Sequence, residues 1–291
     1  MVVNVNPFFV TGRIPAAYFC DRVVESKVLS QALLSQMNVV VTSPRRMGKT
    51  ALVDFVFQQE VIQKDYFTID VDILHTTCFK EFIYALGTAA YDKIASRSDK
   101  MKRLFIATLR SLSASFGYDP IQNTPTFDIK LGDITTPDYT LREIFNFMEQ
   151  ADKRCLVVID EFQQITKYPE KNIEAVLRSY IQKMSNANFV FAGSQRTVLE
   201  EMFLSSRRPF FQSAKLMQLD AIELSVYQDF VVGHFREGGK DINPEAVEVA
   251  YRSFRGVTLY MQRVMKDAYA TTPQGATCDE RLVEQLIDDF V

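Results

Sequence analysis

Histidine and cysteine, the residues that build most zinc sites, are scarce in this sequence. It has two histidines, His75 and His234, and four scattered cysteines, none of them in a Cys-x-x-Cys pair. A structural zinc site needs about four such ligands at short spacings, so a zinc protein is not expected. The scattered cysteines form no disulfide framework either, and reduced thiols are the expectation.

Long apolar runs and a strong charge imbalance are also missing. No apolar run approaches the roughly 18 residues of a membrane-spanning helix, and the N-terminus lacks a basic segment followed by an apolar one. The net charge of −3 gives no support to nucleic-acid binding. With 291 residues, 47% of them hydrophobic, the chain can bury a sizeable core. We expect a soluble, cytoplasmic protein that does not associate with membranes.

The most informative stretch runs from Asn38 to Val53, where the pattern predicts a buried strand, a tight polar loop and the start of a helix. The loop reads Ser43-Pro44-Arg45-Arg46-Met47-Gly48-Lys49-Thr50-Ala51. In a phosphate-binding loop, backbone N–H groups converge on the anion, a lysine reaches the β and γ phosphates, and the next hydroxyl can bind Mg²⁺. Lys49 and Thr50 hold those positions, whereas Ser43 replaces the usual first glycine. The alternative is a helix that happens to begin Gly-Lys-Thr.

A second motif lies about a hundred residues further along the chain. The apolar strand Cys155-Leu156-Val157-Val158-Ile159 delivers two carboxylates, Asp160 and Glu161, at its end. In phosphate-binding-loop NTPases such an aspartate holds the Mg²⁺ shell, and a following glutamate can polarise the attacking water. The alternative is a buried strand that ends in a solvated acidic turn. Because the two motifs occur in the expected order on the expected elements, the sequence predicts nucleotide binding.

The rest of the pattern predicts the α/β fold of a P-loop NTPase, with a three-layer core around a parallel sheet. Further strands are predicted at 65–74, 188–194 and 215–219, with helices between them. The segment at about 96–140 is predicted to be an insertion, with a helix at 100–112 and a strand or hairpin within 116–136.

Only helices are predicted after Asp220, and they form a C-terminal lid subdomain. One helix is expected to begin at Pro244, and the last to begin with a capping box between Thr277 and Glu280. The predicted domains are a core over 1–221, with the insertion, and a helical lid over 222–291.

With these motifs in place, the chain resembles the AAA+-related ATPases of Archaea and bacteria, close to the signal-transduction group called STAND. Five segments carry the resemblance, which extends over nearly the whole length. They are Phe19-Cys20-Asp21-Arg22-x-x-Glu25, the loop at 43–51, Val157 to Gln163, the sensor-like Phe191-Ala192-Gly193-Ser194, and the lid motif Gly256-Val257-Thr258-Leu259-Tyr260-Met261-Gln262.

The resemblance implies a role for each matching residue. Lys49 and the loop N–H groups would bind the β and γ phosphates, Thr50 and Asp160 would hold Mg²⁺, and Glu161 would orient water. Ser194 would read the γ-phosphate, and its alternative is a small residue that closes a strand.

On the base side, the resemblance implies that the lid motif packs near the adenine. Arg22 and Thr258 are then further nucleotide contacts, although Thr258 stands where relatives have a proline. Arg208, with Arg207 beside it, is the candidate arginine finger, and the alternative is a pair of surface arginines.

These motifs predict a Mg²⁺-dependent ATPase that binds ATP and ADP and acts as a slow conformational switch. The alternative is a non-hydrolysing nucleotide-binding module whose output comes from a partner. A protein partner or a homo-oligomer is expected in either case. No guanine-reading Asn-Lys-x-Asp motif is present, and ATP is preferred by resemblance.

Overall fold

The structure, a computed structural model, describes residues 5–119, 124–127 and 130–290. The chain divides into two compact units, each described by itself below. The first, here called the sheet unit, contains Leu29–Thr42 and Phe57–Gln218. The second, here called the loop–lid unit, contains Met1–Val28, Ser43–Val56 and Leu219–Val291.

The sheet unit is built on five parallel strands in the order β2-β5-β6-β1-β7. Their bounds are β1 Val39–Thr42, β2 Tyr66–Asp72, β5 Arg154–Asp160, β6 Ala187–Gly193 and β7 Lys215–Gln218. Every residue of β1 and β6 is buried, as in a parallel sheet covered on both faces. The predicted α/β fold with a parallel P-loop NTPase sheet is therefore confirmed.

The strand register brings the ends of neighbouring strands to one edge of this sheet. Thr42 of β1 pairs with Gly193 of β6, and Asp72 of β2 pairs with Asp160 of β5. The chain leaves β1 directly into Ser43, the first residue of the predicted loop. Ligands of open α/β folds bind at the carboxyl edge of the parallel strands. Asp160 and the start of the predicted loop both lie at this edge.

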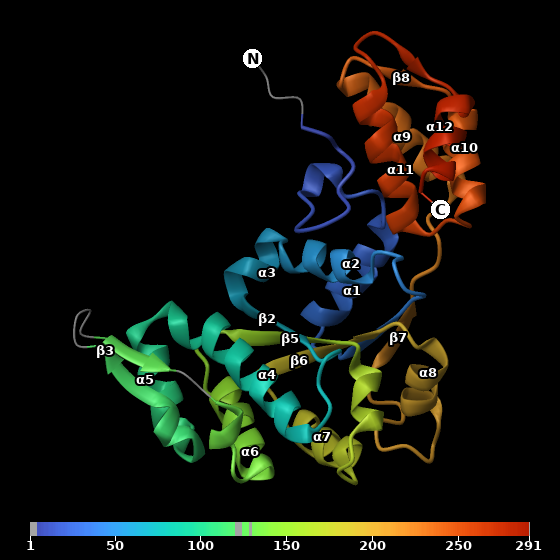
Figure 1. The fold of residues 1–291 in the computed structure, drawn as a ribbon. Helices are drawn as coiled ribbons and strands as arrows, with labels where there is room; N and C mark the ends of the chain where they lie inside the picture. The colour runs from blue at the N-terminus through green and yellow to red at the C-terminus, as the bar shows by residue number, and fades with distance from the viewer. Residues whose placement is uncertain (1–4, 120–123, 128–129, 291) are drawn as a thin grey trace. The chain divides into compact units, whose positions relative to one another are not determined.

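Helices α4 (Phe79–Lys93), α6 (Pro137–Glu149) and α7 (Ile173–Ile181) lie on one side of the sheet in Figure 1. They bury their apolar faces in a core rich in phenylalanine. Phe162 and Phe191, for example, lie with ring centroids 4.6 Å apart. Burying each such side chain stabilises the fold by about 1.5–3 kcal/mol, so this core fixes the helices firmly on the sheet. Two further helices of the unit are α3 (Glu60–Asp65) and α8 (Arg196–Leu204).

The segment predicted as an insertion shares this core. It contains η2 (Ala95–Arg97), α5 (Asp99–Thr108), η3 (Arg110–Ser115), β3 (Phe116–Asp119), β4 (Thr124–Phe127) and η4 (Leu131–Asp133). Strands β3 and β4 pair antiparallel, which confirms the predicted strand or hairpin. Phe105 of α5 is fully buried and meets Phe147 of α6 edge-on, with ring centroids 4.9 Å apart.

The loop–lid unit contains four helices from the C-terminal part of the chain. They are α9 (Leu224–Glu237), α10 (Pro244–Ser253), α11 (Thr258–Thr271) and α12 (Glu280–Asp288). Phe8 packs among them, 5.8 Å from the ring of Phe235 and 6.0 Å from that of Tyr269. The core of this unit therefore draws on the start of the chain as well as on its end.

Two details of the lid differ from the sequence prediction. The segment is not purely helical, because β8 (Asp241–Ile242) and β9 (Thr277–Cys278) pair in parallel. The predicted capping box at Thr277 is also wrong: the N-cap of α12 is Asp279, whose carboxylate accepts a hydrogen bond from the Leu282 N–H at 3.0 Å. Thr277 is held in β9, which leaves the cap to the next acceptor along the chain.

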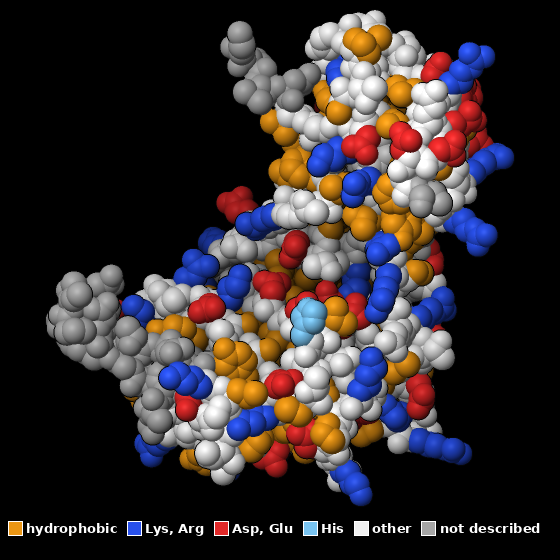
Figure 2. All heavy atoms as spheres, in the orientation of Figure 1, with side chains coloured by type: hydrophobic (Ala, Val, Ile, Leu, Met, Phe, Trp, Pro, Cys, Tyr) orange, Lys and Arg blue, Asp and Glu red, His pale blue; other side chains and the backbone are white. Residues whose placement is uncertain are grey.

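Charges of both signs share the visible surface (Figure 2), and the four cysteines are free thiols. On the face drawn in Figure 2, Lys and Arg side chains are interspersed with Asp and Glu. In the part of the chain that the structure describes, no helix is both long and apolar enough to cross a bilayer. All four cysteines are free thiols. Burial raises the pKa of Cys20 and of Cys155 to about 12, so both stay protonated and unreactive near neutral pH.

Candidate active site

The predicted phosphate-binding loop takes its left-handed backbone conformations at Arg46 and Gly48. Their φ angles are 70° and 87°, whereas Ser43 is not among the residues with positive φ. A glycine is therefore not required at the first loop position, which explains how Ser43 can replace it. Gly48 also accepts the first bond of α2 (Lys49–Phe57), from the Leu52 N–H at 2.9 Å. The Gly-Lys-Thr sequence thus stands at a helix N-terminus, where backbone N–H groups favour an anion.

Two buried polar groups of this loop fit a bound anion. Lys49 is only 7% exposed, so most of its side chain is shielded from bulk solvent. Ser43 is 1% exposed, and its hydroxyl has no hydrogen-bond partner among the described residues. A buried polar group without a partner calls for a missing one, and a phosphate oxygen would satisfy this hydroxyl.

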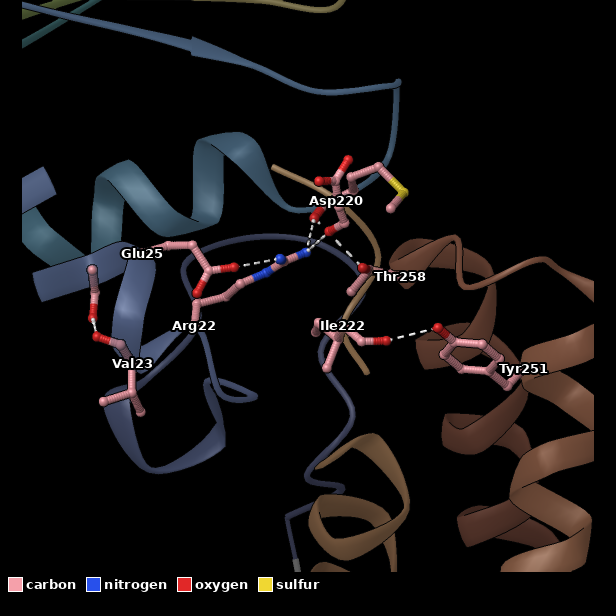
Figure 3. A network of polar contacts seen from close by, with 9 residues as sticks. Arg22, Val23, Glu25, Asp220, Ile222, Tyr251 and Thr258 are labelled. Atoms are coloured by element: carbon pink, nitrogen blue, oxygen red, sulfur yellow. Dashed lines mark hydrogen bonds and ion pairs between the residues drawn. The ribbon is translucent and has the colours of Figure 1, made fainter. Parts of the chain in front are cut away.

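Arg22 joins the N-terminal motif to the loop and to the start of the lid (Figure 3). Its Nη1 donates to Glu25 Oε1 at 2.7 Å, and its Nη2 donates to the Asp220 carbonyl at 2.6 Å and to the Met47 carbonyl at 3.4 Å. The Arg22 side chain is 6% exposed. All three acceptors are oxygens of the protein itself. A contact between Arg22 and a nucleotide stays a prediction.

The first turn of α11 contacts two loop residues, Arg46 and Met47, the second of which also binds Arg22. The Leu259 N–H donates to the Arg46 carbonyl at 3.1 Å, and the Thr258 hydroxyl lies 3.5 Å from the Met47 carbonyl. Thr258 occupies the first position of the helix, where proline is also favoured, so the change from the lid proline keeps the helix start. The threonine adds a hydroxyl that proline lacks.

These contacts fix the direction of the loop peptides. A trans peptide places its carbonyl oxygen opposite the N–H of the following residue. Because the carbonyls of Arg46 and Met47 point to Arg22 and α11, the N–H groups of Met47 and Gly48 point away from those partners. Successive N–H groups that point to one side form an anion-binding concavity.

The lid is attached to this region by a second set of contacts. The Tyr251 hydroxyl donates to the Ile222 carbonyl at 2.8 Å (Figure 3). Gly256 has a φ of 72°, and a Cβ there would come within 2.7 Å of the Ala221 side chain. Both the left-handed conformation and the close approach require glycine at this position of the lid motif.

In the sheet unit, the two carboxylates of the second motif stand at the end of β5. Glu161 takes a left-handed conformation, with φ 55° and ψ 39°, and its N–H donates to Asp160 Oδ1 at 2.8 Å. The Glu161 Oε2 accepts from the Ser194 hydroxyl at 2.9 Å and from Gln163 Nε2 at 2.5 Å. Ser194, which follows β6, therefore meets Glu161, as expected for two residues at one sheet edge.

Gln163 also contacts Glu161, and it is not among the predicted site residues. It lies in η5 (Phe162–Lys167), the turn after Glu161, and it is 2% exposed. The signal in the sequence was a polar residue within the motif Asp160-Glu161-Phe162-Gln163. The spacing of the motif alone did not indicate that the Gln163 amide donates to the Glu161 carboxylate.

The candidate arginine finger is engaged within the sheet unit. Arg208 Nη2 lies 2.5 Å from Glu174 Oε1, and Arg208 Nη1 lies 3.5 Å from Glu201 Oε1. Burial raises the pKa of the Glu174 carboxyl, and the neighbouring Arg208 opposes this rise. Arg207 is exposed. The finger role of Arg208 remains a prediction, and it would require Arg208 to leave Glu174.

Replacing Arg208 with alanine should lower the free energy of unfolding by about 1–3 kcal/mol at pH 7, because it leaves the half-buried Glu174 carboxylate without its partner. Arg207→Ala should stay within about 0.5 kcal/mol of the wild type. A group whose folded pKa is raised contributes stability that is present at low pH and lost as the pH rises through that pKa. Without Arg208 this loss grows, so urea unfolding should show a larger deficit at pH 7 than near pH 4. Equal effects of the two substitutions, or a deficit independent of pH, would contradict this account.

Comparisons with known proteins bear on this geometry. A family model described as an ATPase domain predominantly from Archaea matches residues 19–264. No curated protein matches the sequence.

Several solved structures are similar in fold. The Walker-type ATPase PABY2304 of Pyrococcus abyssi has a TM-score of 0.67 at 15% identity, over 98% of this chain and 76% of that one. The ORC2 protein of Aeropyrum pernix, solved as ADPNP–ADP complexes, has a TM-score of 0.61 at 15% identity, over 98% and 71%. The RuvB Holliday junction branch migration motor of Thermotoga maritima has a TM-score of 0.52 at 15% identity, over 94% and 71%. At such identities the likeness is one of fold.

Proposed function

Since the chain belongs to the family of ATPase domains found predominantly in Archaea, we propose that it binds ATP with Mg²⁺, hydrolyses it slowly and works as a nucleotide-driven conformational switch. The observation that carries the proposal is the anchoring of the loop backbone. The carbonyls of Arg46 and Met47 bond to α11 and Arg22, which turns the next N–H groups away from these partners. A phosphate bound by those N–H groups would act on the same peptides that hold the lid helix.

The phosphate chemistry is assigned to the loop and to the helix that follows it. Lys49 binds the β and γ phosphates, together with the N–H groups of residues 43–51. The Ser43 hydroxyl, buried and without a partner among the described residues, supplies a further donor. Fixed donors of this kind stabilise charge on the transferred phosphoryl group without reorganisation during the reaction.

Thr50 and Asp160 are proposed to hold Mg²⁺, and the donor set fits this ion. A hydroxyl and a carboxylate are hard oxygen ligands of the kind that Mg²⁺ takes beside nucleotide phosphates. When bound, the ion neutralises negative charge on the phosphates. Glu161 orients the attacking water. Ser194, whose single O–H donates to Glu161 in this structure, turns to the γ-phosphate when the nucleotide binds, which leaves Gln163 as the donor to Glu161.

The nucleotide class follows from the family and from a similar structure. ORC2 of Aeropyrum pernix was solved with ADPNP and ADP, and we assign adenine nucleotides to this chain, with Arg22 and Thr258 acting through the loop. Arg208 is engaged by Glu174 and is therefore not available as an arginine finger in this arrangement. We therefore propose that efficient hydrolysis depends on a partner protein or on a second copy of the chain. In that case the isolated chain turns over slowly.

The proposal is tested by single-turnover hydrolysis of radiolabelled ATP with excess protein, in Mg²⁺ and in EDTA, with the nucleotide affinity measured in parallel. We expect wild-type hydrolysis that requires Mg²⁺. Glu161→Gln should keep the affinity within about threefold and lose hydrolysis by about 10²-fold or more, since a neutral amide cannot accept the water proton. Tight binding without wild-type turnover would favour the non-hydrolysing module instead. No binding of ATP or ADP would refute the proposal.

A further inference from the structure

We propose that Gln163 is a positioning residue for hydrolysis, which fixes the carboxylate of Glu161 through its side-chain amide. The inference rests on the proposed function, because it assigns Glu161 as the group that orients water. It adds a residue to which neither the family motif nor the fold gave a role. Glu161, Gln163, Gly193 and Ser194 all lie within the sheet unit.

The first observation is that two donors share one oxygen of Glu161. Gln163 Nε2 at 2.5 Å and Ser194 Oγ at 2.9 Å both donate to Oε2. Two donors from different elements, η5 and the residue after β6, restrain the rotation of the carboxylate about its last bond. A hydrogen bond to an ionised carboxylate is short and about twice as strong as a neutral one, so this restraint is substantial.

The second observation concerns the other end of the Gln163 amide. Its Oε1 is buried and has no hydrogen-bond partner in the described part of the chain. Flipping the amide would place Oε1 against the Glu161 carboxylate, where two negative oxygens repel. The amide therefore donates to Glu161 although its own oxygen goes unsatisfied, and a buried unsatisfied group of this kind calls for an explanation.

The third observation is the space reserved for this amide at Gly193. A Cβ at position 193 would lie 2.0 Å from Gln163 Oε1 and 2.7 Å from the Leu199 side chain. Gly193 is the last residue of β6, directly before Ser194. The absence of a side chain at Gly193 therefore leaves room for the Gln163 amide, and the next residue, Ser194, is the second donor to Glu161.

The test compares the rates of single-turnover ATP hydrolysis by Gln163→Met and Gln164→Met in the presence of Mg²⁺. Methionine keeps the size of glutamine and removes the donor. Gln164 is the matched control, because it lies on the same turn and donates to the Thr76 carbonyl at 3.0 Å rather than to Glu161. We expect Gln163→Met to slow hydrolysis about tenfold to a hundredfold with the ATP affinity within about twofold, and Gln164→Met to stay within about threefold in both. If Gln163 contributed only to stability, Gln163→Met would also lower the ATP affinity and the midpoint of thermal denaturation.

A further variant and a spectroscopic measurement test the contact between Gln163 and Glu161 independently. Gly193→Ala retains the amide but displaces it, so it should slow hydrolysis as Gln163→Met does, with thermal denaturation as the check on folding. The ¹³C resonance of the Glu161 carboxylate, identified with Glu161→Gln, should shift in Gln163→Met and not in Gln164→Met. This resonance needs no turnover, so it tests the contact even if the wild type proves inactive and the proposed function fails. An unmoved resonance, an unchanged rate in an active protein, or faster hydrolysis in Gln163→Met would overturn the proposal.

Discussion

Replacing Lys49 with alanine should weaken the binding of ATP by roughly 30-fold to a few thousand-fold and reduce hydrolysis to background. Lys49 is the first residue of α2 and is 7% exposed, so its charge acts in a site that is largely shielded from solvent. Removing one partner of a buried charge pair costs about 2–5 kcal/mol, and about 1.4 kcal/mol corresponds to a tenfold change in affinity. Isothermal titration with ATP and with ADP measures the effect.

Lys27→Ala is the matched control for this experiment. Lys27 is an exposed lysine of the same unit, on α1 (Val23–Leu34), so its removal changes the net charge equally. Its ATP affinity should stay within about twofold, since exposed charges are screened by salt. If Lys49→Ala binds ATP as tightly as Lys27→Ala does, the loop does not hold the phosphates.

Replacing Arg22 with alanine should destabilise the protein by about 2–4 kcal/mol and also weaken ATP binding. The substitution removes three hydrogen bonds from a buried guanidinium, two of them to the backbone carbonyls of Met47 and Asp220. A buried acceptor that loses its donor costs about 1–3 kcal/mol. The cost is smaller where another donor remains, as Thr258 does for Met47, or where water can enter, as at the part-buried Asp220 carbonyl. The loop peptides lose an anchor at the same time, so their N–H groups are less well ordered for phosphate. Urea unfolding and ATP titration measure the two effects.

Glu25→Ala separates the charge pair from the backbone contacts. Glu25 is 28% exposed and bonds only one of the Arg22 nitrogens in Figure 3, so its loss should cost about 0.5–1.5 kcal/mol. Arg22→Lys, which cannot reach two carbonyls and a carboxylate together, should fall between the two in stability. If Arg22→Ala is no less stable than Glu25→Ala, the carbonyl contacts contribute nothing. Unchanged ATP affinity in a folded Arg22→Ala would show that the loop does not depend on this anchor.

Local pattern was sufficient to predict most of the sheet unit. The strand predicted before the loop is β1, Val39–Thr42, and the strands around Asp160 and at 188–194 agree with β5 and β6 within one or two residues. Each is a short, nearly continuous apolar run bounded by polar residues, and such a run has few other ways to bury its side chains.

The sequence could not decide between two similar neighbouring residues where the choice depended on tertiary contacts. Thr277 and Asp279 are both acceptable N-cap residues, and the pairing of β9 with β8 leaves that role to Asp279. Two adjacent arginines likewise look equivalent in the sequence. Folding places Arg208 beside Glu174 and leaves Arg207 exposed, which no spacing rule distinguishes.

Residue identity and short-range periodicity were sufficient to predict the family resemblance, the α/β class and the chemical types at the two motifs. The contacts of those side chains depend on the packed three-dimensional structure. Arg22 donates to the carbonyls of Met47 and Asp220. Gln163 packs against Gly193 and donates to Glu161. Long side chains have many rotamers, and the one adopted depends on which donors and acceptors burial brings within about 3 Å. That information is absent from a linear pattern and present in the packed core.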